Sequence, residues 1–195
     1  MKWVFLDERV HYDGSQLRAH WILDRTGLVG DALVGFVGSC DVARGEIADL
    51  QDIDGPGIRS SEMLHFLLES FDESGLELAV TRQRLFAAIA GEVLRMKLPS
   101  GIRLRREGDD LYLAEGDEPE GKLSISIATR SPVSTLMHFA LNIRTEDVPV
   151  RAACLADCEV DARAFADGVA ERFVTELDSI RDARAQVRSK GEHDS

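Results

Sequence analysis

The feature of this sequence that most constrains its fold is an alternation of polar and apolar residues over residues 122–129. Lysine and serine side chains alternate there with leucine and isoleucine, a period of two that is typical of a half-buried β-strand. A Ser-Pro pair at residues 131–132 interrupts the pattern, because proline fixes φ and disfavours helix in the residue before it. The apolar run at residues 134–143 therefore predicts an antiparallel partner strand joined by a short loop.

Length and charge restrict the class of protein. The chain has 195 residues, enough for one domain with a real core, and we expect residues 1–188 to form a single α+β domain. Residues 189–195 are predicted to be a polar C-terminal tail. The net charge of −12 repels phosphate backbones, so the sequence argues against a nucleic-acid partner. Because no apolar run approaches the roughly 20 residues that span a bilayer, it also argues against a membrane partner.

The cysteine count and the first residues indicate the compartment. Asp7 follows the first apolar residues too closely for a secretory signal peptide. Three cysteines, an odd number in a chain of this length, argue against a disulfide framework and for a reducing environment. The sequence therefore predicts a cytoplasmic protein.

Several further strands are expected, at residues 3–6, 31–40, 102–105 and 111–114. The last two form a predicted hairpin. Gly35 and Gly38 lie inside the second strand, and glycine within a strand indicates a bulge or the close approach of another backbone or a ligand.

The helices are predicted from capping residues followed by apolar stripes. Ser61 is suited to begin one helix and Thr81 a second one, with residues 76–80 as a short strand between them. A long helix is expected from Asp161 onward. Strands in the middle of the chain with helices before and after them predict an α+β domain, in which the helices pack on a mainly antiparallel sheet.

Residues 121–127 followed by residues 138–143 resemble the core of the lipoate and biotin protein ligases, which share a fold with the catalytic domains of class II aminoacyl-tRNA synthetases. Over nearly its whole length the chain resembles the uncharacterised family called domain of unknown function 366. The stretches that carry this second resemblance are residues 30–33, 61–66, 108–111 and 122–142. The resemblance implies a lipoate/biotin protein ligase-like fold, with a mainly antiparallel central sheet flanked by helices, and it assigns no activity.

Lys122 is the first candidate catalytic residue. The resemblance implies its role, since the matching lysine of the ligases contacts the acyl carboxylate or its activated form. An ammonium held on a strand can stabilise an oxyanion as charge develops. A solvated lysine at the start of a strand is the alternative, because lysine is usually exposed. The presence of His138 and Asn142 in the family's order favours the functional interpretation.

His138 and Cys154 are the other candidate catalytic residues, and both rest on a resemblance to the octanoyl transferases. Those enzymes have a His-Gly pair where this chain has His138 and Phe139, and a nucleophilic cysteine at a place comparable to Cys154. A histidine hydrogen-bonded in the core is the open alternative for His138. A thiol beside an ammonium becomes a better nucleophile. For Cys154, however, a small buried apolar residue is the favoured interpretation.

The candidate substrate-binding residues are Ser124, Asn142, Gly35 and Arg59. The glycine-rich and arginine-rich loops that hold the acyl adenylate in the ligases do not occur in this sequence, so ATP is a candidate cofactor without a recognisable phosphate cradle. Acids such as Asp52 and Asp109 are more typical of caps and turns than of a Mg²⁺ site, and no metal is predicted.

Two functions from different classes follow. The first is an acyl ligase or acyl transferase that acts on a small carboxylic acid or its thioester, with Lys122 as the oxyanion stabiliser. The alternative is a non-catalytic small-molecule-binding or assembly module that kept the fold and lost the phosphate-binding loop. An exposed sheet edge and the apolar face of the C-terminal helix predict a homodimer or a higher homo-oligomer.

Overall fold

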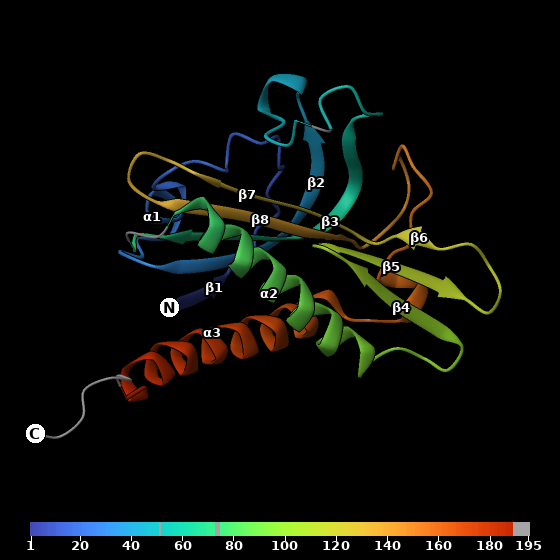
Figure 1. The fold of residues 1–195 in the computed structure, drawn as a ribbon. Helices are drawn as coiled ribbons and strands as arrows, with labels where there is room; N and C mark the ends of the chain where they lie inside the picture. The colour runs from blue at the N-terminus through green and yellow to red at the C-terminus, as the bar shows by residue number, and fades with distance from the viewer. Residues whose placement is uncertain (51, 73–74, 189–195) are drawn as a thin grey trace, which may run out of the picture.

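A five-stranded sheet forms the centre of the computed structural model, which describes residues 1–50, 52–72 and 75–188 (Figure 1). In spatial order its strands are β1 (Lys2–Phe5), β2 (Ala32–Val42), β3 (Ile58–Ser70), β8 (Thr135–Asn142) and β7 (Ser124–Arg130). Only the β1–β2 pair is parallel, and the other three pairs are antiparallel. The predicted α+β class and mainly antiparallel sheet are confirmed. The tail predicted at residues 189–195 lies outside the described residues.

The predicted hairpin of β7 and β8 is confirmed, with Ser126 opposite Phe139 and Ile127 opposite His138. Strand β8 lies between β3 and β7 and is buried along its whole length. This position explains why its sequence is a continuous apolar run, whereas the sequence of the edge strand β7 alternates.

A second sheet of three strands, β4 (Ile102–Glu107), β5 (Asp110–Glu115) and β6 (Gly121–Lys122), lies beside one end of the first. The predicted hairpin of β4 and β5 is present, and Gly108 supplies the left-handed residue of its turn with φ 63°. Lys122 belongs to β6, so the alternating stretch is divided at Leu123 between two sheets.

The helices α2 (Leu76–Arg95) and α3 (Ala162–Gln186) lie on the same side of the large sheet (Figure 1). Phe86 of α2 has its ring centroid 4.9 to 5.2 Å from those of Phe66, Phe139 and Phe173, which makes it the centre of the aromatic core. Asp161 caps α3, as predicted, by accepting a hydrogen bond from Ala164 N. A second apolar cluster on the other face of the sheet involves α1 (Trp21–Thr26).

The helix predicted from Ser61 and the strand predicted at residues 76–80 are both wrong. Ser61 lies in β3, and residues 76–80 form the first turns of α2, so Thr81 is inside the helix and donates its hydroxyl to Glu77 O. Strand β3 is central and buried on both faces beyond Glu62. Its apolar run is therefore continuous, and period alone does not distinguish such a strand from a buried helix.

The apolar face of α3 packs inside the chain. Phe165, Val169, Phe173 and Leu177 of that face are buried in the core. The prediction of a homodimer therefore depends on the sheet edges alone and stays a prediction. Among the described residues, no helix has both the length and the apolar character that crossing a membrane requires.

Candidate functional site

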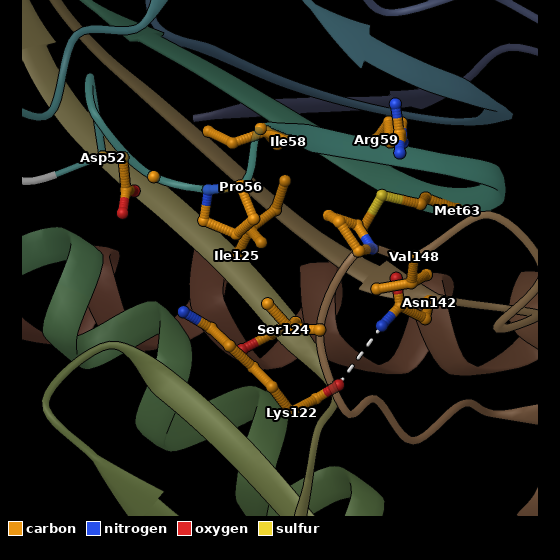
Figure 2. Close-up of a pocket in the computed structure, with 14 residues that line it drawn as sticks. Asp52, Pro56, Ile58, Arg59, Met63, Lys122, Ser124, Ile125, Asn142 and Val148 are labelled. Carbon is orange, nitrogen blue, oxygen red and sulfur yellow. Dashed lines mark hydrogen bonds between the residues drawn. The ribbon is translucent and has the colours of Figure 1, made fainter.

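Two adjoining cavities open where the small sheet meets the edge of the large one. The first has a volume of about 140 Å³ and is shown in Figure 2. Its apolar wall consists of Pro56, Ile58, Met63, Ile125, Val148, Pro149 and Val150. The second has a volume of about 330 Å³ and is more acidic. The residues that line both cavities are Asp52, Ile58, Lys122 and Ile125.

Lys122 stands between the two cavities. Strand β6 holds its backbone, whose N–H donates to Arg151 O at 3.1 Å. Its Nζ lies 2.8 Å from Asp110 Oδ2, and 35% of its side chain is exposed. Burial lowers the pKa of Lys122, but the hydrogen bond and charge of Asp110 outweigh this and raise the pKa overall. The ammonium therefore stays charged and is held in place at the shared wall.

Asn142 and Ser124 hold this arrangement together. Asn142 Nδ2 donates to Lys122 O at 3.3 Å and to Ala153 O at 3.2 Å, and Figure 2 shows the first of these bonds. Ser124 Oγ accepts from Leu111 N at 2.8 Å. Both residues line the first cavity, as expected of substrate-binding residues. Their hydrogen bonds to the backbone indicate that they position Lys122 and the small sheet as well.

His138 lines the second cavity together with Lys122. Its Nε2 lies 3.0 Å from Nδ1 of His65, and its ring stacks on Tyr12 at a centroid distance of 3.9 Å. Burial lowers the pKa of His138 well below its usual range and lowers the pKa of His65 to about 3. The two histidines therefore form a buried neutral pair.

Tyr12 and His65 were not predicted from the sequence. His65 fell inside the helix expected from Ser61, and in β3 it lies diagonally across from His138, because Leu67 is the residue directly opposite His138. The register of β3 against β8, which the sequence alone does not give, is what brings the two histidines together. No local signal in the sequence identifies Tyr12.

Cys154 lines neither cavity. The residue is buried, and its N–H donates to Asp157 Oδ2 at 3.3 Å. Burial, followed by the hydrogen bond to Asp157, raises the pKa of its thiol to about 11. Cys158 is buried too, with a pKa raised to about 11. Both thiols are therefore protonated at neutral pH, a state unsuited to nucleophilic attack.

We expect Cys154 in the native protein at pH 7 to react with iodoacetamide at least about 10-fold more slowly than in urea, because both burial and the raised pKa disfavour the thiolate. The rate should rise with pH toward the pKa of about 11. Peptide mapping by mass spectrometry after timed alkylation gives the rate for each cysteine. A native rate equal to the rate in urea would instead mark Cys154 as a reactive thiol.

Arg59 and Gly35, the two remaining candidate substrate-binding residues, lie in different parts of the structure. Arg59 is exposed on β3, lines the first cavity and forms no ion pair with another described residue. Gly35 lines neither cavity. A Cβ there would come within 2.5 Å of the Trp3 ring, so packing against the aromatic side chains of β1 explains this glycine.

Asp109, which lines the second cavity with Lys122, is held by two side chains of α2. Asp109 accepts from Gln83 Nε2 at 2.7 Å and pairs with Arg84 at 3.1 Å. Burial raises the pKa of Asp109. Within residues 1–50, 52–72 and 75–188, no three His, Cys, Asp or Glu side chains are grouped as a metal site requires.

Several solved structures share the fold. A protein of unknown function from Pyrococcus horikoshi is 36% identical, with a TM-score of 0.87 over 97% of this chain and 98% of that one. A biotin protein ligase from Aquifex aeolicus, in complex with biotin and ATP, has a TM-score of 0.60 at 11% identity, over 93% of this chain and 72% of that one. A bipartite lipoate protein ligase from Thermoplasma acidophilum has a TM-score of 0.55 at 13% identity, over 91% and 84%. The predicted lipoate/biotin protein ligase-like fold is confirmed.

The sequence comparisons agree with the match to the Pyrococcus horikoshi protein. An uncharacterised protein of Methanocaldococcus jannaschii is 30% identical over 192 residues, which cover 94% of this chain and 83% of that protein. The family model described as "Domain of unknown function (DUF366)" matches residues 1–188. This match, together with the 30% identity, establishes that the chain belongs to the DUF366 family.

Proposed function

We propose that this protein binds the acyl group of a small carboxylic acid in the first cavity and transfers it from an activated donor such as a thioester. The observation that carries the proposal is the place of Lys122, which lines an apolar cavity on one side and a polar cavity on the other. An acyl group needs an apolar surface for its chain and a cation at its carbonyl end. The shared wall at Lys122 supplies both.

The first cavity limits the size of the acid. A volume of about 140 Å³ is close to that of an engineered apolar cavity of roughly 150 Å³ that binds benzene, a ligand of six carbons. The apolar chain of an acid such as octanoate is of about this size when its carboxylate lies outside the apolar part, at Lys122. Met63 and Ile125 offer apolar surface to the chain, and Arg59 adds a second cation for an anionic group.

In the proposed reaction an acceptor attacks the carbonyl carbon of the thioester, and the carbonyl oxygen becomes an oxyanion. The Lys122 ammonium stabilises that charge, which is the role of a preorganised cation in acyl transfer. The carbon–sulfur bond then breaks, the thiolate takes the proton that the acceptor releases, and the acyl acceptor and the free thiol leave. Cys154 takes no part, because its thiol is protonated and the residue lines neither cavity.

ATP does not fit the second cavity well. Among the described residues its wall has five acidic side chains and only two basic ones, Arg84 and Lys122. Each of these two cations already pairs with an aspartate. A triphosphate would meet repulsion there, since like charges in a partly buried site raise the energy of the complex. We therefore derive no step through ATP for this protein, although the Aquifex ligase is described in complex with ATP.

The test combines binding with turnover. We expect the affinity for straight-chain acids, measured by calorimetry, to rise about 4-fold per methylene from butyrate toward octanoate and to fall for dodecanoate, which exceeds the cavity. Octanoyl-coenzyme A should release its thiol in the presence of a nucleophilic acceptor. Exchange of labelled pyrophosphate into ATP that depends on octanoate would contradict acyl transfer and indicate adenylation.

A specific observation also favours the alternative, a non-catalytic binding module. Within the described part of the chain, neither cavity is lined by a cysteine. Under this alternative the acids bind with the same dependence on chain length, and octanoyl-coenzyme A releases no thiol above the uncatalysed rate. Turnover therefore separates the two functions, whereas binding alone does not.

A further inference from the structure

Two buried residues in the wall of the second cavity each have a side-chain polar atom without a hydrogen-bond partner among the described residues. Tyr12 is 3% exposed and His138 is 2% exposed. Within the described residues every fully enclosed side-chain nitrogen or oxygen has a hydrogen-bond partner. Tyr12 Oη and His138 Nδ1 have none among those residues, so both atoms keep some exposed surface. Both residues line the second cavity, and we take the cavity as the space from which a ligand reaches these two atoms.

The hydrogen bonds of His65 determine which kind of atom His138 offers. His65 Nε2 lies 3.4 Å from Gly38 O, and a carbonyl oxygen only accepts, so this nitrogen carries the proton. Because His65 is neutral, its Nδ1 is then unprotonated and accepts from Nε2–H of His138 at 3.0 Å. His138, which is also neutral, consequently presents Nδ1 to the cavity as an acceptor. The opposite tautomers would place two lone pairs against each other at Gly38 O.

The charge of the cavity selects the donor that meets this acceptor. Among the described residues the wall has three more acidic than basic side chains, with the acidic ones at Glu46, Asp49, Asp52, Asp109 and Asp110. Such a surface favours a cation and disfavours an anion. A cation without N–H groups would leave Tyr12 Oη and His138 Nδ1 unpaired, at the cost of burying unsatisfied polar atoms.

We infer that the second cavity binds the ammonium group of a small primary amine, which donates hydrogen bonds to His138 Nδ1 and Tyr12 Oη while the surrounding carboxylates balance its charge. In this site His65 is a positioning residue, because it fixes the tautomer of His138 and does not line the cavity itself. The inference does not rest on the proposed acyl transfer, since an ammonium group binds here whether or not an acyl group lies beside Lys122.

The first test uses three probes of similar size on the full chain at pH 7: n-butylammonium, tetramethylammonium and butyrate. In protein labelled with ¹⁵N-histidine, free His138 should show an unprotonated Nδ1, and n-butylammonium should move that resonance in a saturable way. Tetramethylammonium should bind at least several-fold more weakly. Butyrate should leave the His138 resonance in place even if it binds beside Lys122. A protonated Nδ1 in the free protein, or equal effects of the three probes, would overturn the inference.

The second test measures the contribution of each acceptor by calorimetry. We expect Tyr12→Phe, which keeps the stacked ring and removes only Oη, to weaken n-butylammonium about 10-fold, as befits a hydrogen bond from a charged donor. His65→Leu should weaken it too and should change the protonation pattern of the His138 nitrogens, which a merely structural role would leave unchanged. Asp117→Asn removes a charge at an exposed position that lines neither cavity, and it should leave the affinity for n-butylammonium unchanged if binding is local to the second cavity. An unchanged affinity in Tyr12→Phe would contradict the site.

Discussion

Replacing Gly38 with alanine is expected to lower the free energy of unfolding by about 3 kcal/mol or more. A Cβ at this position would lie 1.7 Å from Val10 O, an atom of the backbone that no rotamer change can move away. The segment before it is fixed in turn, because Val10 N donates to Val37 O at 3.1 Å. The pairing of β2 with β3 shifts register between Gly38 and Cys40, which marks a bulge next to this close approach. Relief of the clash therefore requires that two hydrogen-bonded segments separate.

Equilibrium denaturation by urea measures this effect, with Gly45→Ala as the matched control. No atom lies within 4 Å of a Cβ at Gly45, which is exposed in the short 3₁₀ helix at Arg44–Glu46. We expect that variant to remain within about 0.5 kcal/mol of the native protein. If both variants unfolded at the same urea concentration, the close approach of Val10 to β2 would be refuted.

The Gly38 substitution has a second consequence that reaches the candidate site. Gly38 O accepts the hydrogen bond that fixes the tautomer of His65, and through it the tautomer of His138. A displaced bulge should therefore disturb the histidine pair even in molecules that still fold. The same glycine thus supports the sheet and the wall of the second cavity.

Local sequence patterns predicted four strands of the large sheet, β1, β2, β7 and β8, and missed β3. The alternation over residues 122–129 predicted a strand, although burial does not alternate along β7 and Ser124 is its one buried residue. The turn residues around Gly108 predicted the hairpin of β4 and β5. Strand β3 has neither signal. It lies between β2 and β8 and is buried on both faces, so its sequence is apolar without an alternation of polar and apolar residues. Its position depends on contacts with β2 and β8, which the local pattern does not contain.

The candidate site shows the same division. Lys122, Asn142 and Ser124 were predicted because a resemblance in the order of residues identified them, and all three line the first cavity. Tyr12 and His65 come from segments distant in the sequence, and only the pairing of β3 with β8 and the packing of residues 11–13 against them bring the rings together. The prediction of Cys154 rested on its separation from Lys122 along the chain, which does not fix where the thiol lies in space.

The second large effect is expected at Lys122. Replacement with methionine keeps most of the apolar stem and removes the ammonium, so the affinity for octanoate should fall about 10- to 150-fold, the range for a charge-assisted hydrogen bond of roughly 1.5–3 kcal/mol. Stability should change by less than about 1 kcal/mol, because the Lys122–Asp110 pair is partly exposed and solvent hydrates the remaining carboxylate. Asn142 should continue to hold the backbone at this position, since its bond goes to the carbonyl oxygen.

Calorimetric titration of octanoate into the native protein, Lys122→Met and Lys97→Met tests the central claim most directly. Lys97 is an exposed lysine just beyond α2 that lines neither cavity, so its replacement removes the same charge elsewhere. The account predicts that octanoate binds the native protein and Lys97→Met equally and binds Lys122→Met at least about 10-fold more weakly. Equal affinities in all three proteins would contradict it, because Lys122 would then be a solvated lysine rather than the anchor of an acyl group.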